Sequence, residues 1–292
     1  MSKKSERRPV ILVLAPFYLP GFKGGGPIRS IANMVEALHD EFGFRIVTAD
    51  RDLGDTHAYR SVKVDEWNSV GPASVLFVSP RMRTLRGLVD LLRTVEHDAI
   101  YLNSFFDPEF TLRIVLARWL GLVPKRALVI APRGEFSTGA LRLRRWKKVP
   151  YVLAMKCLAV YRSATWHAST DLEAEDVRRV MGSRATVRIA GNCTVLEHSL
   201  LPDGRATDMA PRSQALRICF LSRISPKKNL AFALRVLSEI QCDVVFDIYG
   251  PCEDQSYWRD CVALIAKLPR HVSATYRGAV AQADVQPTLS RY

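Results

Sequence analysis

Apolar runs alternate along the chain with stretches in which apolar residues recur at helical spacing. The strands predicted from this pattern fall at 10–15, 44–49, 62–70, 73–79, 99–102, 127–131, 165–169 and 186–190. Helical spacing follows several of them, as in Ile31, Met34, Val35 and Leu38 after the first strand. Strands that alternate with helices predict right-handed βαβ units. The pattern therefore predicts an α/β fold with a parallel, Rossmann-like sheet.

A polar stretch at 202–214, rich in Pro, Gly, Asp and Ser, interrupts this alternation. A second series then predicts strands at 216–221, 243–249 and 272–276, helices at 229–240 and 256–268, and the start of a helix near 285. We expect a first Rossmann-like domain at 1–200, a linker at 201–215 and a second domain at 216–292. Because the second series has only three strands, we expect this second lobe to be incomplete.

The turn after the predicted strand at 216–221 gathers positive charge, because Arg223, Lys227 and Lys228 all lie on it. A strand that leads into a helix places the free N–H groups and the positive dipole end of the helix at the carboxyl edge of the sheet, which favours an anion. The next strand ends at Gly250, where the missing side chain allows a ligand to approach the backbone. We interpret Arg223, Lys228 and Gly250 as a site that binds a diphosphate.

This turn resembles retaining glycosyltransferases of family 4, in which a strand is followed by G-R-x-x-x-x-K-N and a helix. Arg223 and Lys228 match the Arg and Lys of that motif, whereas Ser222 stands in place of its Gly. The stretches GFKGGGPIRS and APRGEFSTGAL extend the resemblance upstream, so that it covers nearly the whole chain. It implies a GT-B fold of two Rossmann-like lobes, with Arg223 and Lys228 on the diphosphate of a nucleotide sugar.

The resemblance also implies a reaction. A hexosyltransferase of this kind would move a sugar, with retention and without a metal, from a UDP- or GDP-linked donor to a saccharide or lipid-linked acceptor in cell-surface polysaccharide synthesis. The diphosphate would help to deprotonate the acceptor. We expect no cofactor and no metal, because the sequence shows no carboxylate cluster suited to a metal. No protein nucleophile is evident, so no catalytic residue is assigned.

Three successive glycines, Gly24, Gly25 and Gly26, precede the first predicted helix. The loop is not a Walker motif, because no Lys-Ser/Thr pair follows it, and it lacks the last Gly of G-x-G-x-x-G. Asp50, at the end of the second strand, resembles the ribose-binding acid of dinucleotide folds, which keeps nicotinamide binding as an alternative. A loop without a ligand is a further alternative. The family resemblance implies that this loop lies near donor phosphates and acceptor.

Asn103 and Ser104 follow one predicted strand, and Arg133, Gly134 and Glu135 follow another. Because doubly wound sheets bind ligands at the carboxyl ends of their strands, we expect these residues at one edge with the glycine loop. The family resemblance places Asn103, Arg133 and Gly134 on the acceptor side. For Arg133, a surface salt bridge is the alternative to acceptor or phosphate contact.

Two further positions match the family less decisively. His167 matches a family histidine, but a single histidine is more often packed than catalytic, and we interpret it as structural. The turn at 190–192 reads Ala-Gly-Asn where the family has P-N-G, which puts the contact made by Asn192 in doubt.

Composition adds a strong positive charge to this picture. The 292 residues are 48% hydrophobic and carry 42 Lys+Arg against 29 Asp+Glu, a formal charge of +13, which favours anionic partners. Nucleic acid ranks last among them, because no recognition motif is present. The six cysteines stand singly, as expected for a cytoplasmic protein with reduced thiols. No apolar run approaches the roughly 20 residues that span a bilayer, so that any membrane contact would be peripheral.

One basic segment, at 141–162, carries arginines and lysines that alternate with leucines and Trp146. Such a segment suits an anionic membrane surface at the inner face or an anionic acceptor. The alternative is a surface helix whose apolar side packs on the core. Pro150 is expected to kink this helix or to start it afresh.

The end of the sequence departs from the family. Nothing after Gly278 matches the family's E-x7-E motif, and Asp284 is the only acid there. We therefore expect a chain truncated before this motif, with weak donor binding and little or no turnover. The alternative function is a non-catalytic anion- or membrane-binding remnant of such an enzyme.

Overall fold

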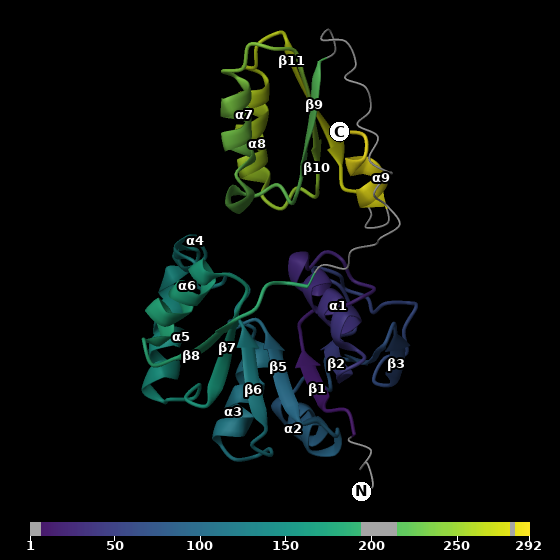
Figure 1. Cartoon of the computed structure of the whole chain (residues 1–292), viewed down its shortest axis with the longest axis vertical. Coiled ribbons are helices and arrows are strands. Elements are labelled where there is room, and N and C mark those ends of the chain that lie inside the picture. The colour runs from purple at the N-terminus through teal and green to yellow at the C-terminus, as the bar shows by residue number, and fades with distance from the viewer. Residues whose placement is uncertain (1–6, 194–214, 281–283) are drawn as a thin grey trace, which may run out of the picture. The chain divides into compact units, whose positions relative to one another are not determined.

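The computed structural model describes residues 7–193, 215–280 and 284–292, and the chain divides into two compact units, 1–197 and 198–292 (Figure 1). Each unit contains its own sheet. Of the linker expected at 201–215, residues 201–214 lie outside the described residues. The two units are therefore described separately, and they are called unit 1 and unit 2.

Unit 1 contains an eight-stranded sheet in the order β3-β4-β2-β1-β5-β6-β7-β8. All neighbouring strands are parallel except β3, which runs antiparallel to β4. The strands are β1 (Val10–Leu14), β2 (Gly43–Ala49), β3 (Trp67–Val70), β4 (Ala73–Val78), β5 (Ala99–Asn103), β6 (Ala127–Ala131), β7 (Ala164–Ala168) and β8 (Thr186–Ile189). The order reverses at β1, whose neighbours β2 and β5 lead outward in opposite directions.

Helices cover both faces of this sheet, which explains the nearly continuous apolar strands. Leu12 and Leu14 of β1 belong to one core, with helices α2 (Leu85–Thr94), α3 (Arg113–Trp119) and α6 (Asp171–Met181). Val13 and Ala15 belong to the core on the other face, with helix α1 (Gly26–Leu38). Because neighbouring β1 residues point to opposite faces and Leu12, Val13 and Leu14 are all buried, this part of the strand must be apolar on both faces.

Unit 2 contains a parallel three-stranded sheet in the order β11-β10-β9. Its strands are β9 (Leu216–Leu221), β10 (Val244–Tyr249) and β11 (Val272–Gly278), and its helices are α7 (Leu230–Leu237), α8 (Gln255–Ile265) and α9 (Val285–Leu289). Helices α7 and α8 lie on one side of the sheet and α9 on the other (Figure 1). The predicted α/β class is thus confirmed in both units.

Several predicted boundaries were wrong. The strand expected at 62–70 is formed only at 67–70. The helix between β5 and β6 starts as a π-helical turn at Pro108–Leu112 that continues into α3, an irregular start that the apolar spacing does not predict. The helix expected from 229 is preceded by a 3₁₀ turn at Pro226–Lys228, because Asn229 adopts a left-handed conformation with φ of 54°.

The basic segment forms two helices, α4 (Thr138–Arg142) and α5 (Arg145–Cys157). The break between them falls at Arg144, which is left-handed with φ of 57°, whereas Pro150 lies inside α5 and does not restart the helix. Neither helix contains a fully buried residue, although Tyr151 and Val152 pack partly against the core. Within the described ranges, no helix has the length and apolar character needed to cross a bilayer.

Candidate functional site

The topological reversal in unit 1 is the place where a doubly wound sheet binds ligands. The loops that follow β1 and β5 meet there, because both leave the carboxyl edge of the sheet on adjacent strands. A cavity of about 200 Å³ lies at this point. It is lined by Pro16, Phe17, Gly24, Pro27, Ile28, Asn103, Ser104, Arg133 and Glu135. The structure thus brings together Gly24 from the loop after β1, Asn103 from the end of β5 and Arg133 from the loop after β6.

The three glycines of the loop after β1 differ in backbone conformation and in the space around them. Gly25 caps helix α1 with φ of 76°, a conformation that favours glycine. A side chain at Gly24 would lie 3.0 Å from both Ile28 and Phe17, so that glycine allows tight packing beside the cavity. Gly26 has open space around the position of a side chain. Glycine is therefore favoured at position 25 by its backbone conformation and at position 24 by tight packing, whereas Gly26 has no such local reason.

Asp52, which sequence reasoning missed, holds this glycine loop. One carboxylate oxygen accepts hydrogen bonds from the backbone N–H groups of Phe22 at 2.7 Å and Lys23 at 3.0 Å. The other accepts from Leu53 at 2.8 Å, and the side chain is buried. The loop conformation is thus set by a carboxylate from the end of β2.

Arg133 is the centre of the polar cluster at the cavity. It follows β6 with φ of 54°, unusual for a residue other than glycine. Its guanidinium donates to Asn103 Oδ1 at 2.7 Å, Asn192 Oδ1 at 2.6 Å and the Tyr101 hydroxyl at 3.0 Å. Among the described residues, no carboxylate lies within ion-pair distance of it. The salt bridge considered as an alternative for Arg133 is therefore absent from this part of the chain.

A chain of hydrogen bonds continues from Arg133 to His167. The Tyr101 hydroxyl lies 2.7 Å from His167 Nδ1, and His167 Nε2 lies 2.8 Å from the Ala190 carbonyl oxygen. Because a carbonyl oxygen can only accept, Nε2 carries the hydrogen, and Nδ1 accepts from the tyrosine hydroxyl. Burial raises the pKa of Tyr101, which keeps its hydroxyl protonated. This places His167 in a supporting network for Arg133.

Glu173 fixes the backbone next to Arg133. Its carboxylate accepts from the N–H of Gly134 at 2.7 Å and from the N–H and hydroxyl of Ser169 at 2.8 and 2.7 Å. Burial is the largest influence and acts to raise the pKa of Glu173, but the hydrogen bonds from Ser169 and Gly134 and the charge of Arg133 outweigh it and lower the pKa. Glu173 thus stays ionised and holds Gly134, whose φ is 72°.

Glu135 plays the same part for the loop after β5. It accepts from the Ser104 hydroxyl at 2.7 Å and from the N–H groups of Phe105 and Phe106 at 2.6 and 3.2 Å. Burial raises the pKa of Glu135 despite these bonds. Ser104 has φ of 139°, a strained conformation for serine. Two glutamates, buried Glu173 and partly buried Glu135, therefore hold the loops next to Asn103 and Arg133.

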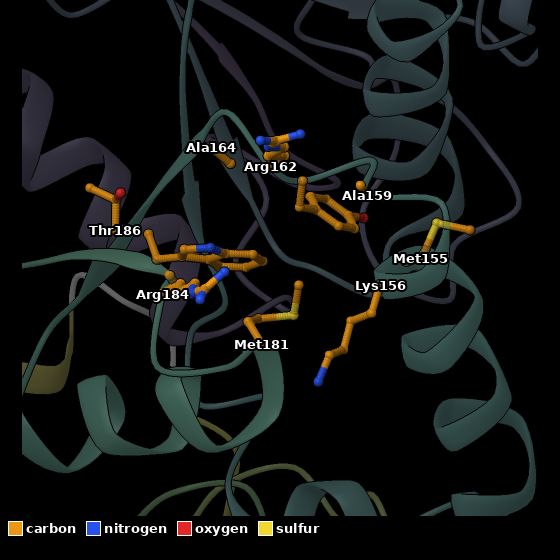
Figure 2. Close-up of a pocket in the computed structure, with 11 residues that line it drawn as sticks. Met155, Lys156, Ala159, Arg162, Ala164, Met181, Arg184 and Thr186 are labelled. Carbon is orange, nitrogen blue, oxygen red and sulfur yellow. The ribbon is translucent and has the colours of Figure 1, made fainter.

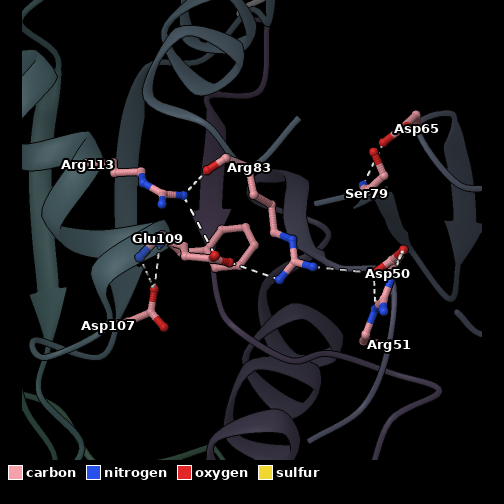
Figure 3. Close-up of polar contacts among 9 residues, drawn as sticks. Asp50, Arg51, Asp65, Ser79, Arg83, Asp107, Glu109 and Arg113 are labelled. Carbon is pink, nitrogen blue, oxygen red and sulfur yellow. Dashed lines mark hydrogen bonds and ion pairs between the residues drawn. The ribbon is translucent and has the colours of Figure 1, made fainter. Parts of the chain in front are cut away.

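Asp50 is occupied by arginines. Arg51 donates to both oxygens of its carboxylate, at 2.9 and 3.0 Å, and Arg83 approaches at 3.7 Å (Figure 3). Arg83 also pairs with Glu109 at 2.9 Å, and Asp50 is only 2% exposed. A carboxylate held in this way cannot bind ribose hydroxyls. The geometry disfavours the nicotinamide-binding alternative at this position.

In unit 2, the turns that follow β9 and β10 lie side by side. Ile224 donates its N–H to the Pro251 carbonyl at 2.9 Å, and Gly250 donates to the Gly278 carbonyl at 2.8 Å. Gly250 has φ of 141°, and a side chain there would lie 1.9 Å from the Ser222 carbonyl oxygen. The close approach of the Ser222 carbonyl therefore requires glycine at position 250, whether or not a ligand also approaches this backbone.

The two cations of this turn differ in their contacts. Arg223 pairs with Glu253 at 2.6 Å, and 36% of each side chain is exposed. Lys228 ends the 3₁₀ turn and is exposed. Its side chain makes no hydrogen bond or ion pair with any residue in the described ranges. The structure thus places Arg223 beside Gly250, with Arg223 bound to a carboxylate.

No protein family model matches the chain, and no curated protein matches it by sequence. Solved structures match its fold. HepE from Anabaena in complex with UDP-glucose is 15% identical, with 96% of this chain and 71% of HepE covered and a TM-score of 0.60. A sucrose-phosphate synthase from Thermosynechococcus elongatus is 14% identical, with 97% and 73% covered and a TM-score of 0.67. The fold is GT-B.

OtsA, solved without ligand, is a third match at 11% identity, with 97% of this chain and 76% of OtsA covered and a TM-score of 0.54. The GT-B fold predicted from the sequence is thus confirmed. At this level of identity the likeness establishes the fold alone.

Proposed function

We propose that this chain is a family 4-type hexosyltransferase. In this proposal the enzyme transfers a sugar from a UDP- or GDP-linked donor to a saccharide or lipid-linked acceptor in cell-surface polysaccharide synthesis. The observation that carries the proposal is the turn after β9: within a GT-B fold, Arg223 and Lys228 follow a parallel strand at the spacing of the family motif. The match to HepE, solved with UDP-glucose, supports the donor class.

The proposed chemistry needs charge stabilisation at the donor. Negative charge develops on the leaving diphosphate as the bond to the sugar breaks, and preorganised cations lower the barrier by stabilising it. Removing one such donor typically costs about 3–4 kcal/mol of barrier. In our proposal, Arg223 and Lys228 supply these cations, and Gly250 keeps the two turns of unit 2 close together.

The Arg223–Glu253 pair does not prevent this role. A solvent-exposed ion pair contributes about 0–1 kcal/mol, because water screens it and both side chains lose freedom. A diphosphate carries more charge than one carboxylate and offers several oxygens to a guanidinium, so that charge-assisted bonds to it are stronger. We therefore expect Arg223 to exchange Glu253 for the donor diphosphate.

The cluster in unit 1 is the proposed acceptor side. A guanidinium has five N–H donors, and Arg133 uses three of them on Asn103, Asn192 and Tyr101. Two N–H groups, on a guanidinium without a direct ion pair among the described residues, remain for an acceptor hydroxyl or phosphate. The cavity beside Arg133 and the glycine loop at 24–26 complete this proposed acceptor and phosphate site.

Calorimetric titration of the full chain with UDP tests the donor site. We expect Lys228→Ala to weaken UDP binding at least about tenfold, about 1.4 kcal/mol. Lys227→Ala is the matched control, because it removes the same charge from the neighbouring exposed position. Equal affinities of the wild type and Lys228→Ala for UDP would overturn the proposal.

We also propose that the chain contacts the cytoplasmic face of the inner membrane peripherally. A remnant of the enzyme without catalytic activity could make the same contact. Trp146, Leu143 and Leu153 are 74, 64 and 61% exposed on α5 and the residues before it. Arg142, Arg144 and Arg145 line the same surface hollow as Trp146. Exposed apolar side chains among cations are typical of a surface that binds anionic lipid. Vesicle co-sedimentation that does not depend on lipid charge would contradict it.

A further inference from the structure

A second cavity of unit 1 lies at the opposite edge of the sheet from Arg133. It is formed where β7 and β8 begin, since Ala164 and Thr186 are their first residues, and it has a volume of about 230 Å³ (Figure 2). The ends of α5 and α6 form its other walls through Met155 and Met181. One water molecule takes about 30 Å³, so that the cavity has room for a group larger than a water.

Three cations line this cavity from different parts of the chain. Lys156 comes from α5, Arg162 from the connection before β7, and Arg184 from the connection between α6 and β8 (Figure 2). Its lining contains no Asp or Glu. Lys156 donates to the Val180 carbonyl at 3.0 Å. Within the described ranges, neither Arg162 nor Arg184 makes an ion pair.

The charge of the cavity stays positive when the helix ends are counted. Each helix C-terminus carries about half a negative charge, so that the ends of α5 and α6 together supply about −1. Against the three cations this leaves about +2. A phosphomonoester carries about −1.5 to −2 at neutral pH, which matches this charge better than the single charge of a phosphodiester or a carboxylate.

Trp166 provides an independent observation at the same cavity. It lines the cavity and is 1% exposed, and burial of a polar group normally comes with a hydrogen bond. Its indole N–H makes no hydrogen bond with any residue of the part of the chain that the structure describes. This N–H is not among the fully buried side-chain atoms without a partner, so that water or a ligand in the cavity can supply its acceptor, and a phosphate oxygen is one such group.

An apolar hollow of about 250 Å³ adjoins this cavity along α5, and Lys156 lines both. The hollow is lined by Leu141, Lys148, Val149, Val152, Leu153, Lys156 and Val180. An anion-binding cavity next to an apolar hollow fits an amphiphile, with the charged group in the first and an alkyl chain in the second. Leu153, which is 61% exposed, lies on the surface already proposed to contact the membrane.

We propose that the cavity at the start of β7 and β8 binds the phosphomonoester headgroup of a membrane lipid. This inference rests on the proposed membrane contact of α5 and adds headgroup recognition to it. Lys156, Arg162 and Arg184 neutralise the phosphate, the Trp166 N–H donates to one of its oxygens, and the apolar hollow takes the adjoining chain.

Vesicle co-sedimentation of the full chain tests the proposal. Phosphatidylcholine vesicles carry either phosphatidic acid or phosphatidylserine, with the amounts adjusted to equal zeta potential. We expect the wild type to bind phosphatidic acid vesicles about tenfold more tightly. The double variant Arg162→Gln/Arg184→Gln should lose this preference and retain phosphatidylserine binding. The control variant Arg178→Gln/Arg188→Gln removes equal charge from exposed positions outside the cavity and should keep the preference for phosphatidic acid.

Each result decides the question. A preference lost only in the Arg162/Arg184 variant supports the proposal. No preference in the wild type, or equal loss in both variants, overturns it. Binding of soluble sn-glycerol 3-phosphate as tight as that of phosphatidic acid vesicles would overturn the lipid assignment in favour of a soluble phosphate ester. If the proposed membrane contact itself is wrong, the wild type will not bind phosphatidylserine vesicles, which is a separate readout.

Discussion

Arg133 and Arg223 both follow a parallel strand, but their surroundings differ. Arg133 donates to three neutral oxygens, and Asn103 and Tyr101 among its partners are buried. Arg223 pairs with one carboxylate and is 36% exposed. The first guanidinium is held in place by neutral partners, and among the described residues it forms no direct ion pair, although its charge acts on nearby Glu173. The second forms a direct ion pair with a partner that it can exchange. In the proposed function, the acceptor side is therefore preorganised, and the donor side must rearrange to bind.

The rigid part of the proposed donor site is its backbone, and Gly250→Ala should give the largest effect. A side chain at Gly250 would meet the Ser222 carbonyl at 1.9 Å, and φ of 141° is strained for alanine. We expect a loss of at least about 3 kcal/mol of stability in unit 2, measured by hydrogen exchange of β9 and β10. Gly26→Ala, where space is open, should change stability by less than about 1 kcal/mol. A harmless Gly250→Ala would show that the turns separate easily.

Arg133→Met tests whether the acceptor side is held as tightly as its contacts indicate. The variant leaves buried Asn103 and Tyr101 without their donor, at about 1–3 kcal/mol for each group. Hydrogen-exchange protection of β5 and β6 should fall. Arg223→Met is the matched control and should cost unit 2 no more than about 1 kcal/mol, because it breaks only a half-exposed pair. Similar losses in both variants would remove the contrast between the two arginines.

Glu253→Gln should give the smallest effect, and in the favourable direction. Without the competing carboxylate, Arg223 is free for a diphosphate, and UDP should bind up to about fivefold more tightly, about 1 kcal/mol. Glu239→Gln removes the same charge from another exposed position and should leave the affinity nearly unchanged. Calorimetry distinguishes the two variants. Weaker UDP binding by Glu253→Gln would mean that the ion pair helps to form the site.

The alternation of strands and helices predicted the fold class, because buried parallel strands and amphipathic helices leave distinct periods in the sequence. It also placed Asn103 and Arg133 at one edge of the sheet, since both follow parallel strands. Periodicity could not show Tyr101 or Glu173. Tyr101 sits inside an apolar strand, and Glu173 looks like an ordinary acid in the first turn of a helix.

The pattern of apolar and polar residues also could not predict local backbone conformation. Arg133 and Arg144 are left-handed although this conformation is uncommon for residues other than glycine, asparagine and aspartate, so the residue types gave no signal for it. The partner of Arg223 lies 30 positions away in the sequence, and an exposed arginine can reach many acids. The same sequence pattern is therefore compatible with a diphosphate site and with the Arg223–Glu253 ion pair that the structure shows.

The contribution of the second phosphate is the most direct test of the claim that Arg223 and Lys228 bind a nucleotide diphosphate. The measurement is the ratio of the dissociation constants for UMP and UDP, determined by calorimetry for the wild type and for Arg223→Gln/Lys228→Ala. We predict a ratio of at least about ten in the wild type and close to one in the double variant. The same ratio in both proteins would contradict the account.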